Sequence, residues 1–272
     1  DAIKNVSLTK GGFPARFGGR LSSVLEIDMK EGDLREFHGE GSLGIISSKL
    51  TLEGPIWKDR TSFMVSGRRT YLDILAAPFM NDGLRAGYYF ADLNAKINHV
   101  ISRNDRIYLS YYNGIDEFSV REEYTTDPFF GGEEGYDESG LDWGNHTAAL
   151  RWNHLFNDKL FSNLTATFSQ YRFRIGYESF FDDGFSTSTS AFEYFSLIRD
   201  YGLRYDLEYA LNNDHKLRFG ASYTNHTFQP GVAQIQDNSN GESLDSILNL
   251  SRSIYANDAY AYVEDDWQIN DK

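Results

Sequence analysis

The sequence contains no cysteine and only five prolines among its 272 residues. The absence of cysteine excludes disulfide bonds and thiolate metal sites. No run of about 18 apolar residues is present, which excludes a membrane-spanning helix. Basic residues are outnumbered, with 26 Lys and Arg against 40 Asp and Glu, and the net charge is -14. This balance argues against nucleic acid as a partner, because no basic patch outweighs the acids.

Aromatic residues are abundant, with 18 Tyr and 20 Phe, and they stand in alternating patterns. In "HKLRFGASYTNH", Leu217, Phe219 and Tyr223 alternate with charged and hydroxyl residues. This period of two predicts a β-strand with one apolar face and one hydrated face. The segment "KLFSNLTATFSQYRFR" continues for 16 residues without Gly or Pro. Strands of soluble sheets usually have about five or six residues, so this length favours a tilted membrane crossing with an extension.

Short polar turns recur at intervals of roughly 50 residues, flanked by aromatic and β-branched segments. They are Lys58-Asp59, Asn104-Asp105, Asn157-Asp158, Asn213-Asp214 and Asn270-Asp271. Longer segments rich in Gly, Asp, Ser and Asn alternate with them, at 72–88, 120–141, 182–190 and 230–253. Short turns at one end of a sheet and long loops at the other are typical of outer-membrane β-barrels.

Aromatic side chains gather beside these short turns. We expect them to form an interfacial girdle on the periplasmic side, although aromatics packed at the strand ends of a soluble core remain an alternative for each residue. The residues are Trp57, Trp152, Phe156, Phe161, Tyr209 and Trp267.

The segment "KGGFPARFGGRLSS" stands near the N-terminus and is the most distinctive part of the sequence. Its glycines permit positive φ and close backbone approach, and its proline restricts the loop. The arginines Arg16 and Arg20 would be costly if buried alone. We therefore expect them to meet carboxylates across a hydrated interface, although a solvated loop is the alternative. Strand parity makes Asp92, Asp206 and Glu264 the candidate acids.

This segment resembles the end of the plug domain of TonB-dependent outer-membrane receptors. The residues that carry the resemblance, with an expected structural or gating role, are Gly11, Gly12, Pro14, Arg16, Phe17, Gly18, Gly19, Arg20, Ser22 and Ser23. Three later segments are similar to barrel strands of the branch of this family that is common in Bacteroidetes-type bacteria. The first, which is similar to the first barrel strands, is "FHGEGSLGIISSKLTLEGPIWKDRTSFMVSGRRTYLD", and the others are "WGNHTAALRWNHLF" and "AYAYVEDDWQIN".

The resemblance implies a fold and a division of the chain. Residues 1–33 would be the C-terminal end of a plug domain, and residues 34–272 the N-terminal part of a transmembrane antiparallel β-barrel. The fold class expected is therefore all-β. About ten strands are expected here, whereas plugged barrels of this kind have about 22. The chain is thus expected to be a fragment of a longer receptor.

The resemblance also implies active import of a scarce nutrient across the bacterial outer membrane, with no enzymatic step, cofactor or metal ion. The nutrient could be an iron chelate, cobalamin, an oligosaccharide or a peptide. The implied partners are the TonB–ExbB–ExbD complex, contacted through a segment outside this sequence, outer-membrane lipid, the nutrient ligand, and a surface lipoprotein that serves some relatives as a lid. Nucleic acid is not among them.

The polar segment 120–141 is the expected site of recognition outside the cell. Its aromatic residues, which would stack on a ligand or contact a partner, are Tyr124, Phe129, Phe130 and Tyr136. A solvated acidic loop that only shields the barrel mouth is an equal alternative. A Ca²⁺ site is a further alternative for this segment, although it shows no EF-hand spacing.

Other functions find less support in the sequence. The six histidines show no metal-ligand spacing. The adjacent acids Asp265 and Asp266 would point to opposite faces of a strand and would not share a substrate. A passive porin or other structural outer-membrane barrel remains the first alternative, but it gives no reason for the plug-like segment. A soluble β-propeller is the second alternative, although its repeats contain four short strands rather than two long ones.

Overall fold

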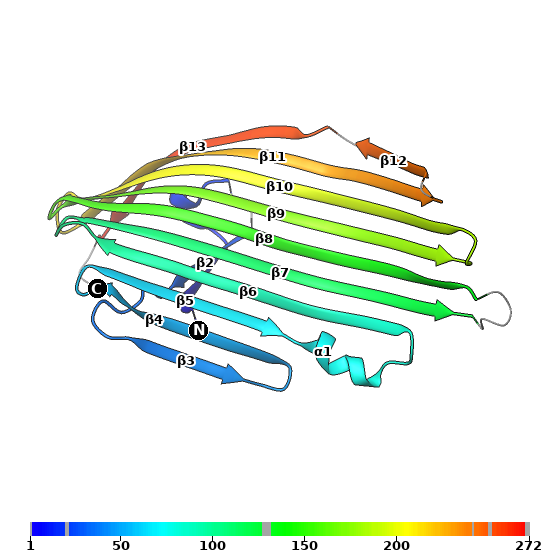
Figure 1. Ribbon diagram of the computed structural model, residues 1–272. Helices are drawn as coiled ribbons and strands as arrows, with labels where there is room; N and C mark the ends of the chain where they lie inside the picture. The colour runs from blue at the N-terminus through cyan, green and yellow to red at the C-terminus, as the bar shows by residue number, and fades with distance from the viewer. Residues whose placement is uncertain (1, 20–21, 127–131, 241, 250–251, 270–272) are drawn as a thin grey trace.

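The computed structural model describes residues 2–19, 22–126, 132–240, 242–249 and 252–269, and these form two antiparallel sheets (Figure 1). The small sheet is a hairpin of β1 (Ile3–Lys10) and β2 (Ser23–Met29), with the 3-10 turn η1 (Ala15–Phe17) between its strands. The first strands of the large sheet are β3 (His38–Leu43), β4 (Ser47–Trp57), β5 (Thr61–Thr70) and β6 (Leu84–Val100).

The remaining strands of the large sheet are longer, apart from β12 and β13. They are β7 (Asp105–Thr125), β8 (Glu134–Asn157), β9 (Leu160–Asp182), β10 (Thr187–Ala210), β11 (His215–Ser239), β12 (Glu242–Asn249) and β13 (Ile254–Trp267). The short helix α1 (Leu72–Ala76) and the 3-10 turn η2 (Ala77–Phe79) connect β5 to β6. Among the described residues, no helix is both long and apolar enough to cross a membrane.

Consecutive strands from β3 to β11 pair antiparallel with one another, and with β12 and β13 the described part of the large sheet has 11 strands. Both β12 and β13 pair with β11, β12 along its last part and β13 along its first. The expectation of an all-β, partial antiparallel barrel of about ten strands is therefore confirmed. Strands β7 to β11 are long, and the neighbour on either side supplies hydrogen-bond partners over most of their length.

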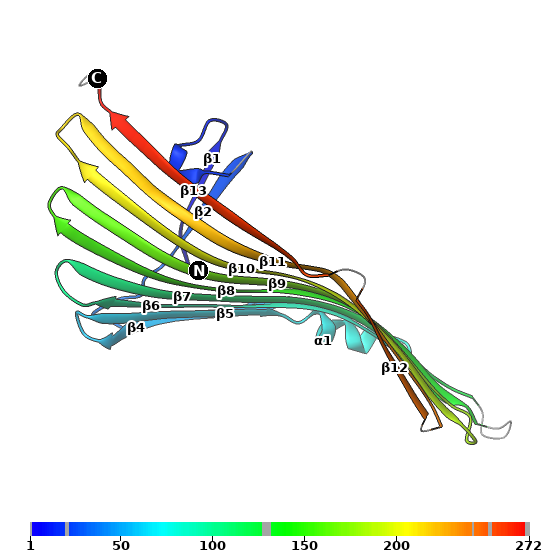
Figure 2. The ribbon, with the colours of Figure 1, turned by 90° about the horizontal axis from the view of Figure 1, so that it is seen from above.

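The large sheet has two chemically different faces. Figure 2 shows the β1–β2 hairpin on one side of it, near β13, and we call this side the inward face. The opposite, outward face carries Leu93, Leu109, Leu150 and Leu203, all at least 40% exposed. Alternation along each strand places charged residues opposite them on the inward face. We call the surface formed by these four leucines the apolar band, and it is continuous across neighbouring strands.

The turns at the left end of the sheet in Figure 1 are short, as predicted. The prediction of long polar loops at the other end was largely wrong. Strand β7 runs to Thr125 and β8 begins at Glu134, so most of segment 120–141 is strand, and β11 likewise continues to Ser239. Pairing with adjacent strands satisfies the backbone of these polar segments and overrides their loop-like composition. The turn Asn270-Asp271 lies outside the described residues.

The aromatics beside the short turns occupy both faces. Trp152 and Phe156 alternate on the outward face, where they are 41% and 50% exposed. Phe161 pairs with Glu208 and shares its inward face, which the prediction of a single girdle did not anticipate. The outward members remain in place for an interfacial girdle.

Candidate functional site: the seat of the N-terminal hairpin

The segment between β1 and β2 crosses the inward face of the large sheet and contacts it through a short 3-10 turn. Pro14 has φ -53° and its carbonyl accepts a hydrogen bond from Phe17 N at 3.1 Å. The turn projects Arg16 toward β13, while the Arg16 guanidinium also lies 4.8 Å from the centre of the Phe17 ring. Proline and this hydrogen bond together hold the arginine in one direction.

Arg16 forms an ion pair with Glu264 on β13. Its Nη1 donates to Glu264 Oε1 at 2.6 Å, and Arg218 Nη1 on β11 donates to the same oxygen at 3.0 Å. The side chains of Arg16 and Glu264 are 32% and 15% exposed. One carboxylate therefore joins the hairpin to two strands of the large sheet. Arg16 meets a carboxylate, as expected, and of the three candidate acids Glu264 is its partner. Arg20 lies outside the described residues.

The other two candidate acids have different partners. Asp92 accepts from Arg68, whose Nη2 lies 2.7 Å from its Oδ2, and Asp206 accepts from Arg204 and Tyr262. Glu264 keeps its second oxygen, Oε2, buried without a hydrogen-bond partner among the described residues. A buried carboxylate oxygen without a donor is costly. The contact of Arg16 with Glu264, which we call the seat of the hairpin, therefore leaves one acceptor oxygen of Glu264 unused.

Gly18 is required at its position by close approach to β13. A Cβ there would lie 2.9 Å from Tyr260 Cδ2, a distance at which the ring must move. Gly11 and Gly19 adopt φ angles of +79° and +75°, which glycine reaches at no steric cost. Of the glycines of the plug-like segment, Gly18 therefore serves packing, and Gly11 and Gly19 serve the course of the backbone.

The residues that follow β2 make a second set of contacts with the large sheet. Lys96 Nζ donates to Met29 O at 3.2 Å, and Ser62 Oγ donates to Glu31 O at 2.8 Å. Gly32 follows with φ +78°, and a Cβ there would lie 2.3 Å from Phe63 O. None of these residues was predicted from the sequence to contact the sheet. A glycine directly after the charged end of a strand is the signal that was available.

Asp33 then fixes the start of the connection to β3. Its Oδ1 accepts from Arg35 N at 2.6 Å and from Glu36 N at 2.9 Å. The backbone N–H groups of Glu36 and Arg35 hold the pKa of Asp33 below its ordinary value. The hairpin is thus tied to the large sheet at two places, at its turn through Glu264 and after β2 through Lys96 and Ser62.

The structure does not bring the described aromatics of the expected recognition loop onto one face. Tyr124 pairs with Gly135, whereas Tyr136 pairs with Glu123, so the two tyrosines lie on opposite faces. Tyr136 stacks on Phe180 with ring centres 5.6 Å apart and donates a hydrogen bond to Glu178. Phe129 and Phe130 lie outside the described residues.

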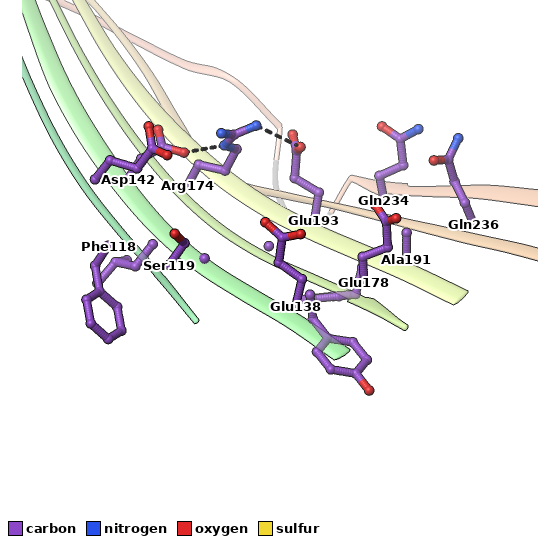
Figure 3. A pocket seen from close by; sticks show the side chains of 16 residues that line it. Phe118, Ser119, Glu138, Asp142, Arg174, Glu178, Ala191, Glu193, Gln234 and Gln236 are labelled. Atoms are coloured by element: carbon purple, nitrogen blue, oxygen red, sulfur yellow. Dashed lines mark hydrogen bonds and ion pairs between the residues drawn. The ribbon is translucent and has the colours of Figure 1, made fainter. Parts of the chain in front are cut away.

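A polar depression of about 360 Å³ lies on the sheet toward the outer ends of β7–β11, which are the ends away from the short turns (Figure 3). Figure 3 shows Arg174 between Asp142 and Glu193, and its Nη1 is 3.6 Å from Glu193 Oε2. Two carboxylates thus neutralise the guanidinium, which leaves it poorly suited to an anionic ligand. Within the described part of the chain, no group of three or more His, Asp or Glu side chains is arranged to hold a metal ion.

A smaller cavity of about 290 Å³ lies between β5, β6 and β7 and is lined by polar and aromatic side chains. The Arg68 guanidinium packs 4.7 Å from the centre of the Phe90 ring. Tyr88 OH donates to Asp116 Oδ1 at 2.9 Å. Aromatic faces beside hydrogen-bonding groups suit a neutral, polar ligand such as a sugar or an amide. No local sequence pattern groups Arg68, Phe90 and Asp116, because they are far apart in the chain.

Comparisons with known proteins give only distant likenesses. No protein-family model matches the sequence, and no curated protein matches it. The structure is similar to the ferric yersiniabactin uptake receptor FyuA from Yersinia pestis, with 13% identity, a TM-score of 0.42 and coverage of 99% of this chain and 50% of that one. It is also similar to the siderophore receptor PirA from Acinetobacter baumannii, with 11% identity, a TM-score of 0.31 and coverage of 90% and 62%.

A third similar structure is a variant of the ferric enterobactin receptor PfeA from Pseudomonas aeruginosa, with 11% identity and a TM-score of 0.31. The match covers 88% of this chain and 58% of that one. The chain therefore spans less than two thirds of the length of each of these receptors.

Proposed function

We propose that this chain belongs to a TonB-dependent receptor of the Bacteroidetes type, which imports a scarce nutrient across the bacterial outer membrane. The observation that carries the proposal is the seat of the hairpin, in which Arg16 reaches Glu264 on the inward face of the sheet. A plug inside a barrel needs such contacts between its own polar groups and the charged lumen wall. A passive porin would have no use for them.

In this proposal residues 1–33 form the end of the plug and residues 34–272 form the first part of the barrel. The outward apolar band, which includes Leu109, Leu150 and Leu203, faces lipid. Charged residues of the same strands face the plug. This arrangement agrees with the alternation of lipid-facing apolar and lumen-facing polar residues in outer-membrane barrels.

Transport would depend on rearrangement of the plug when the TonB–ExbB–ExbD complex pulls on it. The seat at Glu264 consists of a few charge-assisted hydrogen bonds, which are directional and break over a short displacement. The inward cavity around Arg68 and Phe90 is the candidate ligand contact in this part of the barrel. An iron chelate, cobalamin, an oligosaccharide and a peptide all remain candidate ligands, and a surface lipoprotein remains a candidate lid.

The test uses the full-length protein that contains this chain, expressed in its source cells. Its location is determined by separating outer-membrane and soluble fractions. Uptake of radiolabelled candidate ligands is then compared in cells with and without TonB. We expect the protein in the outer membrane and uptake that is lost without TonB. Uptake that persists without TonB would favour the passive porin, and a protein in the soluble fraction would favour the β-propeller.

A further inference from the structure

The connection between β5 and β6 carries an exposed apolar surface that the proposed import function does not explain. It comprises α1 (Leu72–Ala76) and η2 (Ala77–Phe79), with the sequence "LDILAAPF". Ile74 is 62% exposed and Phe79 is 89% exposed. The single charged side chain of this segment, Asp73, is paired with Arg69 at 2.7 Å. The segment therefore offers apolar side chains with little charge among them.

The contacts of Asp73 place α1 over the outward face of the sheet. The Cβ of Asp73 lies 3.1 Å from the position of a Cβ built on Gly87. Gly87 alternates with Tyr89 and Leu93 on the outward side of β6, away from the hairpin. The partner of Asp73, Arg69, packs its guanidinium 4.6 Å from the centre of the outward Tyr89 ring. Helix α1 therefore does not line the lumen.

The same contacts place α1 at the outer margin of the apolar band. Leu93 and Ile97 are outward on β6, and each is 40% exposed. A tilted strand crosses the apolar layer of a membrane in about ten residues. Counted from Val100, the inner end of β6, the layer ends close to Ala91. Gly87, on which α1 packs, lies a short distance beyond that level.

We propose that α1 and η2 form an interfacial element whose exposed side chains, above all Ile74 and Phe79, insert among the acyl chains of the outer leaflet. The inference rests on the proposed membrane location of the sheet. Its basis is position, because α1 packs on the outward face of β6, the strand that carries the outward Leu93 and Ile97, a short distance beyond the apolar band. Apolar side chains on a short interfacial helix gain by entering the boundary between headgroups and acyl chains. A protein lid seated on this segment is the competing occupant.

Site-specific labelling can test this, because these 272 residues contain no cysteine that would compete for the label. The full-length protein is prepared with Ile74→Cys or Phe79→Cys, labelled with an environment-sensitive fluorophore, and reconstituted into phosphatidylcholine vesicles with brominated acyl chains. Leu203→Cys, in the apolar band, is the membrane control. Phe185→Cys, 96% exposed in the turn between β9 and β10, is the aqueous control.

We expect brominated lipid to quench the label at Ile74 and Phe79 nearly as strongly as at Leu203, and several-fold more strongly than at Phe185. Quenching at Leu203 alone, with Ile74 and Phe79 quenched by aqueous iodide instead, would overturn the inference and leave the membrane location intact. That outcome would favour a protein lid. Absence of lipid quenching at all four positions would overturn both the membrane location and the inference.

Discussion

Arg16 and Glu264 lie at opposite ends of the chain, yet Arg16 Nη1 is 2.6 Å from Glu264 Oε1. Arg218 shares this carboxylate at 3.0 Å. The pair joins the N-terminal hairpin to the last described strand of the large sheet. Because the contact is partly buried and charge-assisted, it can hold the hairpin in position while remaining breakable.

Arg16→Ala should loosen the hairpin in the full-length protein. We expect a coupling free energy between Arg16 and Glu264 of about 1–2 kcal/mol, since charge-assisted hydrogen bonds contribute about 1.5–3 kcal/mol and Arg218 retains part of the interaction. A double-mutant cycle of Arg16→Ala and Glu264→Ala, followed by chemical denaturation, measures it. Cells that carry Arg16→Ala should also admit a large, normally excluded antibiotic. Additive single mutants and unchanged permeability would count against the seat.

Gly32→Ala should destabilise the protein more than Gly11→Ala. Both glycines have positive φ, +78° and +79°, so each substitution incurs a backbone cost of about 1–2 kcal/mol. Only at Gly32 would the added Cβ also lie 2.3 Å from Phe63 O, whereas nothing lies within 4 Å at Gly11. The difference in unfolding free energy between the two variants isolates the contact. Equal destabilisation would show that the connection relaxes away from β5.

Leu203→Arg should impair folding into membranes. Leu203 is 52% exposed on the outward face, and an arginine near the middle of the bilayer costs about 2–4 kcal/mol in a barrel. Thr224→Arg is the matched control, because Thr224 lies on the inward face between Gly202 and Asp258. The free energy of folding into lipid vesicles is measured for both. A larger loss with Thr224→Arg would reverse the assignment of the two faces.

The turn at Asp33 should lose its stabilising effect in acid. The pKa of Asp33 is lowered in the folded protein by hydrogen bonds from Glu36 N and Arg35 N. Its contribution is therefore present above the unfolded pKa, about 3.9, and is lost as the pH falls through the lower folded value. The unfolding free energy of the natural protein should exceed that of Asp33→Ala at pH 7, and the difference should shrink below pH 4. A difference that does not vary with pH would exclude the carboxylate as its cause.

The outer ends of the strands show where local sequence is a poor guide. Segment 120–141 is rich in Glu, Gly and Asp and resembles a loop, yet Arg121 pairs with Glu138 across β7 and β8. Backbone hydrogen bonds from both neighbouring strands support it. Tyr124 and Tyr136 were grouped by their closeness in sequence, and cross-strand register separates them onto opposite faces. That register depends on pairing between strands, which composition does not encode.

The sequence by itself determined the strands and their two faces, because side-chain alternation is a local property: Leu217 and Phe219 had to oppose Lys216 and Arg218 once the segment was extended. It also predicted the short turns and a carboxylate partner for Arg16. Only the tertiary structure decided which acid pairs with Arg16. Glu264 lies near Arg16 because of the curvature of the sheet and the order of its strands. The tertiary structure likewise decided that helix α1 lies on the outward face. Its contact with Gly87 places it there, and no pattern in its own sequence does so.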